Sequence, residues 1–356
     1  MSLPKTMKAA VLFGESDMRL VEDYPVPSPG PEEVLIHVGA CAICGTDPKI
    51  LAHGWQNQPP YGRYIFGHEY AGTVVALGPG VTEFKVGDRV AIESHKGCGL
   101  CDNCRDGLYN TCLNYGNAAK GHRHYGFTVN GGYAEYVANH INTAYKIPDT
   151  LSIEQATLIT TSATSLYGIR RIGGIQAGET VVVFGPGAIG LMAVIMARLL
   201  GAGTIILIGT RPERLEVGLK LGADVALNVN DGPVVERVME LTGGRGASVV
   251  LECAGSTQSA IDAVRMTKKN GRIAAIAMYK ENPPLDLNRI AQSNITVAGS
   301  KGEGERSLAQ ALPLLCRPGI DLSPLITHTF PLSEVHAAFR TAEGRLGGAI
   351  KVVVKP

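Results

Sequence analysis

The chain has 356 residues, of which 45% are hydrophobic and 18% are charged. This supplies ample material for buried cores, and a prior of roughly 150 residues per domain suggests two domains. With 33 basic and 32 acidic residues the net charge is +1, which argues against nucleic acid or a membrane surface as a partner.

Neither a secretory signal nor a membrane span is evident in the sequence. The first fifteen residues, MSLPKTMKAAVLFGE, lack an apolar core followed by a cleavage site of small residues. The longest apolar helical stretch, 188–202, is interrupted by Arg198 and is too short to span a bilayer. We therefore expect a cytoplasmic protein.

Residues 7–150 are rich in glycine and proline and contain short strand-like runs. Examples are 32–40 (EEVLIHVGA), 70–78 (YAGTVVALG) and 88–94 (DRVAIES). Short strands separated by turn residues predict an irregular, partly antiparallel β domain. The tail 347–356 (GGAIKVVVKP) is a further strand that could return to this domain.

Four of the eight cysteines lie within fifteen residues, at Cys98, Cys101, Cys104 and Cys112. A reducing compartment disfavours disulfides there. Short C-x2-C steps let thiolates converge on one ion, and four thiolates make a closed tetrahedral zinc site. An iron–sulfur cluster has similar ligand spacing and is the main alternative. A closed zinc site has no open position for substrate, so its role would be structural.

From residue 180 to about 299, apolar β-branched runs alternate with amphipathic segments. The strands are expected at 179–185, 204–209, 224–229, 247–255, 272–278 and 294–300. The helices between them are expected at 188–202, 212–223, 233–244 and 256–271. Six short apolar runs with intervening helices predict an α/β fold with a doubly wound parallel sheet.

The loop GPGAIG connects the first of these strands to its helix and contains Gly185, Gly187 and Gly190. In this context Gly185 would make the tight turn, Gly187 would admit a pyrophosphate, and Gly190 would let helix and strand pack closely. Ala188 and Ile189 would complete the pyrophosphate-binding loop at the helix N-terminus. The segment is therefore predicted to bind a dinucleotide.

The end of the second strand favours NADP over NAD as the cofactor. NAD-binding enzymes usually carry an acidic residue there, which holds the ribose 2′-hydroxyl. Here the positions are Gly209, Thr210 and Arg211, so a hydroxyl and a guanidinium are available for a 2′-phosphate. The alternative for Arg211 is an ordinary solvated surface charge.

Two further stretches carry candidate metal ligands, CAICGTDPKI with Cys44 and Thr46, and GHEYAG with His68 and Glu69. A cysteine, a histidine and a carboxylate, together with water, are what an open catalytic zinc site needs. Taken singly, each is an ordinary residue, because an isolated cysteine usually belongs to a core and an isolated His-Glu pair to a surface.

Taken together, the motifs resemble the zinc-dependent medium-chain alcohol and polyol dehydrogenases. The matching segments are ICGTD, GHE, GDRV at 87–90, the four-cysteine segment, GGYAEY at 131–136, and GPGAIG. They occur in the family's order and cover essentially the whole chain. The resemblance implies a GroES-like catalytic domain formed by residues 1–155 and 293–356. It also implies a Rossmann dinucleotide-binding domain at 156–292.

The resemblance also implies roles for individual residues. Cys44 and His68 would bind a catalytic zinc, Glu69 would be a ligand or a neighbour that exchanges with one, and Thr46 would accept the alcohol proton. Family members often have a further ligand just before the Rossmann domain, where this chain has only Thr160 and Thr161. Glu69 is therefore favoured, and Glu154 is the alternative.

A second departure is Lys49, which stands where many polyol and threonine dehydrogenases have histidine. Lys49 or His53 would then serve the proton relay, or Lys49 would bind an anionic group or simply face solvent. Lys351, in the tail strand, would reach the cofactor pyrophosphate.

The expected reaction is hydride transfer between a secondary alcohol, preferably a polyol or sugar alcohol, and NADP. The alternatives are an NAD-dependent L-threonine, amino-alcohol or simple secondary-alcohol dehydrogenase and, more remotely, a non-catalytic nucleotide-binding relative. The resemblance further implies one catalytic and one structural zinc, and a homodimer or homotetramer.

Overall fold

The computed structural model describes residues 3–356 and contains two compact units. Unit 1 combines the N-terminal part of the chain up to Thr160 with Glu303–Pro356, and unit 2 is Thr161–Gly302. The chain thus leaves unit 1, builds unit 2 and returns. No helix within residues 3–356 is long and apolar enough to cross a membrane.

Unit 1 is built mainly from β-strands, as its many short apolar runs predicted. Its largest sheet has seven strands in the order β10-β6-β5-β3-β18-β17, and β9 also pairs with β3. The bounds are β3 (Glu33–Ala42), β5 (Glu69–Leu77), β6 (Arg89–Ile92), β9 (Tyr136–His140), β10 (Ala144–Lys146), β17 (Ile326–Pro331) and β18 (Lys351–Lys355). All pairings except β17–β18 are antiparallel.

Two smaller sheets complete unit 1. One is formed by β1 (Thr6–Gly14), β2 (Asp17–Pro25) and β4 (Tyr64–Ile65), and the other by β7 (His95–Lys96) and β8 (Arg123–His124). The helices are α1 (Asp47–His53), α2 (Asp102–Arg105), α3 (Ile153–Ala156), α10 (Ser307–Leu315) and α11 (Val335–Gly344). One apolar core includes residues from β1, β3, β5, β6, α11 and β18.

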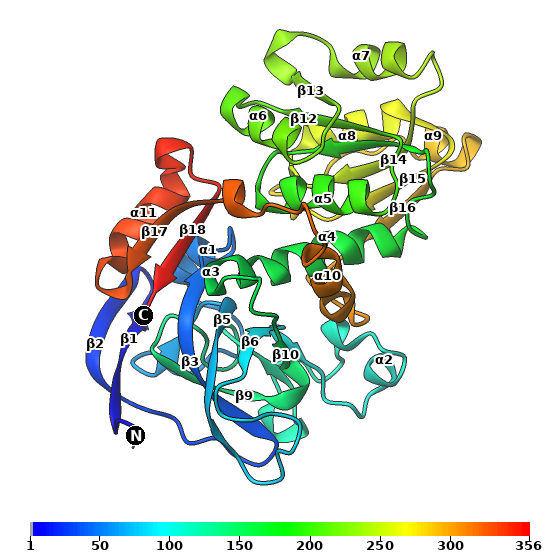
Figure 1. The fold of residues 1–356 in the computed structure, drawn as a ribbon. Helices are drawn as coiled ribbons and strands as arrows, with labels where there is room; N and C mark the ends of the chain where they lie inside the picture. The colour runs from blue at the N-terminus through cyan, green and yellow to red at the C-terminus, as the bar shows by residue number, and fades with distance from the viewer. Residues whose placement is uncertain (1–2) are drawn as a thin grey trace. The chain divides into compact units, whose positions relative to one another are not determined.

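The tail strand returns to unit 1, as the sequence suggested. β18 pairs antiparallel with β3, so that Val353 lies opposite Ala42 and Val354 opposite Cys41. Figure 1 shows β18, in red, beside the blue strand β3, which lies about 300 residues earlier. The middle of the large sheet is therefore assembled from opposite ends of the chain.

Unit 2 contains a six-stranded parallel sheet in the order β13-β12-β11-β14-β15-β16. This is the strand order 3-2-1-4-5-6 of a doubly wound dinucleotide-binding fold. The strands are β11 (Thr180–Phe184), β12 (Thr204–Gly209), β13 (Val225–Asn228), β14 (Ala247–Glu252), β15 (Thr267–Ala275) and β16 (Thr296–Gly299). All six were predicted from the apolar runs.

Helices cover both faces of this sheet: α5 and α6 lie on one face, and α7, α8 and α9 on the other (Figure 1). They are α5 (Ala188–Leu199), α6 (Pro212–Lys220), α7 (Val234–Leu241), α8 (Thr257–Met266) and α9 (Leu287–Gln292), and α4 (Leu158–Arg171) precedes β11. Residues 190–197 of α5 are all buried, which accounts for the apolar character of that stretch.

Several predicted elements of unit 2 end about three residues early in the structure, and the largest difference is at the end of α8. The sequence suggested a helix over 256–271, but α8 ends at Met266 and Thr267 already belongs to β15. The pairing of Thr267 with Ala247 of β14 extends the strand backwards. Sheet pairing therefore overrides the helical propensity of the lysines that follow.

Candidate active site and metal centre

Three strand ends of unit 1 meet at one place, and this brings the candidate ligands together. Cys44 follows the end of β3, His68 precedes β5, and Glu69 is the first residue of β5, opposite Ala42. On the other edge of β3, the backbone nitrogen of Ile43 donates to the carbonyl of Val352, at 2.8 Å. Continuing that register places Lys351 beside Cys44.

Cys44, His68 and Glu69 form a group whose candidate ligand atoms all lie within 4.8 Å of one another. His68 is 6% exposed and Glu69 is 4% exposed, whereas Cys44 is half-buried. A thiolate, an imidazole and a carboxylate are the donor types that zinc prefers, and three protein ligands leave one position open. The residues present therefore fit a catalytic zinc ion.

Asp47 orients His68 in a way that the sequence analysis missed. Its Oδ2 accepts hydrogen bonds from the Cys44 backbone nitrogen at 2.8 Å and from the Tyr133 hydroxyl at 2.7 Å. Its Oδ1 lies 3.3 Å from Nδ1 of His68. A carboxylate at Nδ1 fixes the ring and leaves Nε2 for a metal. The signal was the Asp that follows the threonine in ICGTD.

The charges around His68 also affect its protonation. Burial lowers the pKa of His68, but the negative charge of Asp47 and the Cys44 sulfur raise it, and the net result lies well above the usual range. Asp47 and the Cys44 sulfur attract positive charge, and a bound metal ion would supply it. The same negative groups therefore favour cation binding at this point.

Lys351 binds Glu69 directly, within the core of unit 1. Its Nζ donates to Glu69 Oε2 and lies 3.5 Å from the carbonyl of Ile43. Both side chains are almost completely buried. A cofactor pyrophosphate was only one contact that the sequence left open for Lys351, and in the structure its side chain pairs with Glu69 instead. The alternative ligand Glu154 instead pairs with Lys355, at 2.6 Å, on a more exposed surface.

The candidate relay residues differ in their environments. Thr46 is half-buried and is the N-cap of α1, but its hydroxyl makes no capping hydrogen bond. Lys49 and His53 are exposed. Thr160 and Thr161 are buried, and the Thr160 hydroxyl donates to the carbonyl of Ile92 at 3.1 Å.

Aromatic side chains pack beside His68. The Phe127 ring lies 4.5 Å from the His68 ring, between centroids, and 4.9 Å from Trp55. On the other side Phe127 stacks on His124 at 3.8 Å. The Trp55 indole donates to the Tyr115 hydroxyl at 2.9 Å. Packing of this kind restricts the His68 ring to one orientation.

The four clustered cysteines also converge, and their candidate ligand atoms all lie within 4.8 Å of one another. Cys98 and Cys104 have their sulfurs 3.9 Å apart, as do Cys101 and Cys112. A disulfide needs about 2.05 Å. Zinc–sulfur bonds of about 2.3 Å in a tetrahedron place sulfurs about 3.8 Å apart. The spacing therefore fits a tetrahedral zinc–thiolate site.

Hydrogen bonds to Cys98 favour its thiolate form. Backbone nitrogens of Leu100 and Cys101 donate to Cys98 Sγ, each at 3.4 Å, and Asn114 Nδ2 donates to the same sulfur at 3.2 Å. The Asn114 amide is the main reason why the pKa of the Cys98 thiol falls to about 5. A deprotonated sulfur is the form that binds metal.

The glycine loop of unit 2 has the shape that a pyrophosphate requires. Gly185 has φ +88°, a conformation that L side chains rarely adopt. A Cβ on Gly190 would lie 1.9 Å from the Gly185 carbonyl oxygen, so no side chain fits there. A Cβ on Gly187, the N-cap of α5, would meet nothing within 4 Å. Open space at a helix N-terminus fits a dinucleotide phosphate.

A cavity of about 420 Å³ in unit 2 includes the end of β12. Gly185, Gly209 and Thr210 line it, but Arg211 does not. Arg211 is half-buried and is the N-cap of α6. Arg265 of α8, which the sequence analysis did not single out, lines the same cavity.

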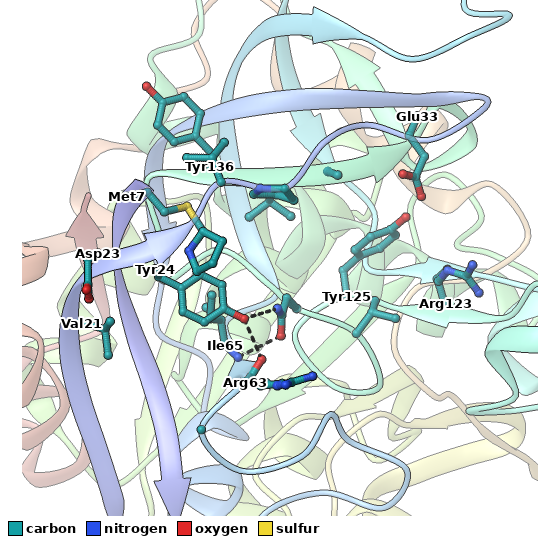
Figure 2. Close-up of a pocket in the computed structure, with 18 residues that line it drawn as sticks. Met7, Val21, Asp23, Tyr24, Glu33, Arg63, Ile65, Arg123, Tyr125 and Tyr136 are labelled. Atoms are coloured by element: carbon teal, nitrogen blue, oxygen red, sulfur yellow. Dashed lines mark hydrogen bonds between the residues drawn. The ribbon is translucent and has the colours of Figure 1, made fainter. Parts of the chain in front are cut away.

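A second hollow, of about 700 Å³, lies in unit 1 and contains none of the predicted site residues (Figure 2). The Tyr24 hydroxyl donates to the carbonyl of Arg63 at 3.0 Å and accepts from Asn130 at 3.2 Å. Asn130 in turn accepts from the backbone of Ile65 at 3.0 Å. These groups satisfy one another and hold β2, β4 and the Asn130 loop together.

Comparison with known proteins identifies the family. Residues 30–149 match the model of the alcohol dehydrogenase GroES-like domain, and residues 188–317 match the model named zinc-binding dehydrogenase. The chain is also 32% identical to a sorbitol dehydrogenase of Bacillus subtilis (strain 168), over 100% of this chain and 99% of the relative. The chain belongs to the zinc-dependent medium-chain alcohol dehydrogenases.

Other relatives of this family of alcohol dehydrogenases agree with the assignment. An L-threonine 3-dehydrogenase of Streptomyces coelicolor is 34% identical, over 97% of this chain and 98% of the relative. A protein of Sinorhizobium meliloti 1021 described as a zinc-binding dehydrogenase, solved with NADP, superposes with a TM-score of 0.90. Its identity is 30%, over 99% of this chain and 100% of that one.

The family assignment confirms two predictions, the α/β fold with a GroES-like and a Rossmann domain and the enzymatic nature of the chain. Zinc and a nicotinamide dinucleotide are the cofactors of this zinc-dependent alcohol dehydrogenase. The family thereby favours an enzyme over the non-catalytic relative.

Proposed function

We propose that this alcohol dehydrogenase oxidises a polyol or sugar alcohol at a secondary carbon and uses NADP as hydride acceptor. The observation that carries the proposal is the group of Cys44, His68 and Glu69, whose ligand atoms lie within 4.8 Å of one another. A Cys/His/Glu set without a further thiolate resembles the polyol branch. Similarity to the sorbitol dehydrogenase over the whole chain supports the same substrate class.

In this proposal Cys44, His68 and Glu69 hold the catalytic zinc, and Cys98, Cys101, Cys104 and Cys112 hold a structural one. Bound zinc would supply Lewis-acid chemistry, which lowers the pKa of a substrate hydroxyl towards neutrality. Asp47 would keep the His68 ring oriented through Nδ1, and Lys351 would hold the Glu69 carboxylate in place. Both act on the zinc ligands and do not touch substrate.

Thr46 is the proposed proton acceptor for the substrate hydroxyl. Its Oγ1 is available because it makes no capping hydrogen bond to α1, and it lies two residues from Cys44. Thr46 Oγ1 would take up the substrate proton while passing its own hydroxyl proton onward, and a bound nicotinamide would supply the hydride acceptor. Lys49 and His53 are both exposed, so a proton released in that direction passes to water.

The proposed cofactor contacts lie in unit 2. Gly185, Gly187, Ala188, Ile189 and Gly190 would hold the pyrophosphate at the start of α5. Gly209 and Thr210 line the cavity at the end of β12, and no carboxylate occupies the strand end to repel a 2′-phosphate. Arg211 would reach that phosphate from the start of α6. The S. meliloti relative with bound NADP supports this choice.

We also propose that unit 1 carries out catalysis and unit 2 binds the cofactor. The division expected from the sequence, 1–155 with 293–356 and 156–292, would separate β16 from its sheet, because β16 pairs with β15 in unit 2. Limited proteolysis of the holoenzyme, with and without NADP, tests whether Thr161–Gly302 gains protection as one body. The resemblance to the dehydrogenase family also suggests a homodimer or homotetramer. Sedimentation of the purified protein would distinguish these two oligomeric states.

The test of function is nicotinamide absorbance on mixing zinc-loaded protein with sugar alcohols, L-threonine and simple secondary alcohols. Each substrate is run with NADP and with NAD, and Cys44→Ser serves as the blank. Turnover of a sugar alcohol with NADP is the expected result. Turnover of L-threonine alone with NAD would favour the second candidate, an L-threonine dehydrogenase. That candidate rests on the 34% identity to the Streptomyces enzyme.

A further inference from the structure

We propose that Pro186 and Gly209 act as a pair that sets the choice of cofactor. In the structure the Pro186 ring fills the space that any side chain at position 209 would need. The carboxylate that selects NAD is therefore excluded sterically as well as being absent from the sequence. This inference deepens the proposed NADP-linked function and rests on it.

The steric conflict is explicit in the geometry of unit 2. A Cβ on Gly209 would lie 2.4 Å from Cδ and 2.5 Å from Cγ of Pro186. Carbon atoms pack at about 3.5–4.0 Å, so even alanine would overlap the ring. The next obstacle, Cδ2 of Leu215, would be at 3.4 Å, which is ordinary contact for a flexible side chain. Pro186 is thus the residue that bars a side chain here.

The Pro186 ring cannot readily move aside. Proline has a fixed φ and a closed ring, so it has no rotamer that vacates the space. The preceding residue, Gly185, donates its backbone nitrogen to the carbonyl of Ile208, at 2.8 Å, which ties the loop to the end of β12. A Cβ on Gly185 would lie 2.8 Å from Cα of Ala254, so the loop is confined on its other side as well.

The steric conflict lies at the strand end where dinucleotide-binding proteins select NAD or NADP. Gly209 is the last residue of β12 and follows the glycine loop by about 20 residues. This is where an Asp or Glu would accept a hydrogen bond from the ribose 2′-hydroxyl of NAD. Pro186, Gly209 and Thr210 line one cavity. The same contact therefore keeps a carboxylate away from the end of β12, while Glu236 and Asp262 line the cavity elsewhere.

The test compares wild type with Pro186→Ala, Gly209→Asp and the double variant. Affinities for NADP and NAD are measured by equilibrium titration without substrate, and thermal stability is measured on the same preparations. Gly209→Asp alone should melt well below wild type and bind both cofactors at least about tenfold more weakly. The clash distorts the loop, and the carboxylate repels the 2′-phosphate. The double variant should recover the melting temperature of Pro186→Ala and bind NAD more tightly than NADP.

A matched control uses Pro233, which lines the same cavity but does not supply any of the three atoms nearest to a Cβ on Gly209. Pro233→Ala should not rescue Gly209→Asp. The inference is overturned if Gly209→Asp alone melts normally and already prefers NAD, or if both proline variants rescue it equally. Wild-type preference for NAD would instead refute the NADP part of the proposed function. The melting temperatures would still show whether Pro186 excludes a side chain at position 209.

Discussion

Lys351 and Glu69 form a buried ion pair, although 282 residues separate them in the sequence. Burial lowers the pKa of Lys351, but the adjacent Glu69 charge raises it, and the net result lies above its usual value. Glu69 also belongs to the ligand group with Cys44 and His68, so the ion pair lies next to the candidate zinc site. A lysine on the tail strand thus supplies the counter-charge of a candidate zinc ligand.

Replacing Lys351 with methionine should destabilise the protein strongly. The substitution leaves the Glu69 carboxylate buried without its partner, which typically costs about 3–5 kcal/mol. Urea unfolding measures the change. Lys355→Met is the control on the same strand, since Lys355 pairs with Glu154 in a more exposed setting. An exposed pair contributes about 0–1 kcal/mol. Equal losses in the two variants would contradict a special role for the buried pair.

Asp47→Asn should weaken zinc binding without removing a ligand. The neutral amide no longer holds Nδ1 of His68 by charge, and loss of such a partner usually lowers metal affinity by about 10–100-fold. Release of zinc to a chromophoric chelator measures the effect. Asp23→Asn, at an exposed position of unit 1, should release zinc as the wild type does. Identical release curves for all three proteins would show that Asp47 does not orient His68.

Cys44→Ser and Cys101→Ala should separate the two metal sites. Each variant should contain about one zinc equivalent less per chain than wild type. Cys44→Ser should abolish turnover and leave the melting temperature nearly unchanged. Cys101→Ala should lower the melting temperature markedly, because binding energy at a closed zinc site is also folding energy. Cys316→Ala, which removes a half-buried cysteine outside both groups, should change neither quantity. Normal zinc content in Cys101→Ala would refute the structural site.

Stability should fall between about pH 4.5 and 7 because of Glu93. Burial, and next the charge of Glu303, raise the pKa of Glu93 from 4.5 to about 7. The folded state therefore holds this proton more tightly than the unfolded state. The resulting stabilisation, of the order of 3 kcal/mol, is complete below about pH 4.5 and is lost as the pH rises to about 7.

Urea unfolding of wild type and Glu93→Gln at several pH values between 5 and 8 measures this dependence. The variant carries no titrating group at position 93, so its stability should change less with pH over this range. Glu22→Gln, at an exposed position, should follow the wild-type curve. Equal pH dependence in wild type and Glu93→Gln would contradict the raised pKa.

Patterns within short segments predicted much of the fold. The six strands of unit 2 were visible as short apolar runs, and the central ones, β11, β12 and β14, are buried almost throughout. The strand–glycine–helix arrangement at Gly185–Gly190 could be read locally, since the motif lies within six residues and the close contact of Gly190 is with the carbonyl oxygen of Gly185. The four-cysteine segment was equally local. Boundaries such as the end of α8 depended on sheet pairing and were less accurate.

The partners of the ligands could not be predicted, because they depend on long-range register. Lys351 reaches Glu69 only because β18 pairs with β3 so that Val353 lies opposite Ala42. A shift of one residue would point Lys351 to the other face. Tyr133 reaches Asp47 across 86 residues for a similar reason. The contact between Pro186 and Gly209 likewise joins two loops that look independent in the sequence.

The pairing of β18 with β3 has a consequence for synthesis on the ribosome. Cys44, His68 and Glu69 emerge early, but Lys351 emerges 282 residues after Glu69. At about 5–20 residues per second this is a delay of roughly 15–60 s. During that interval the Glu69 carboxylate lacks its counter-charge and β3 lacks a neighbour. We expect the nascent chain to fold the nucleotide unit first and to need protection from aggregation until the tail strand arrives.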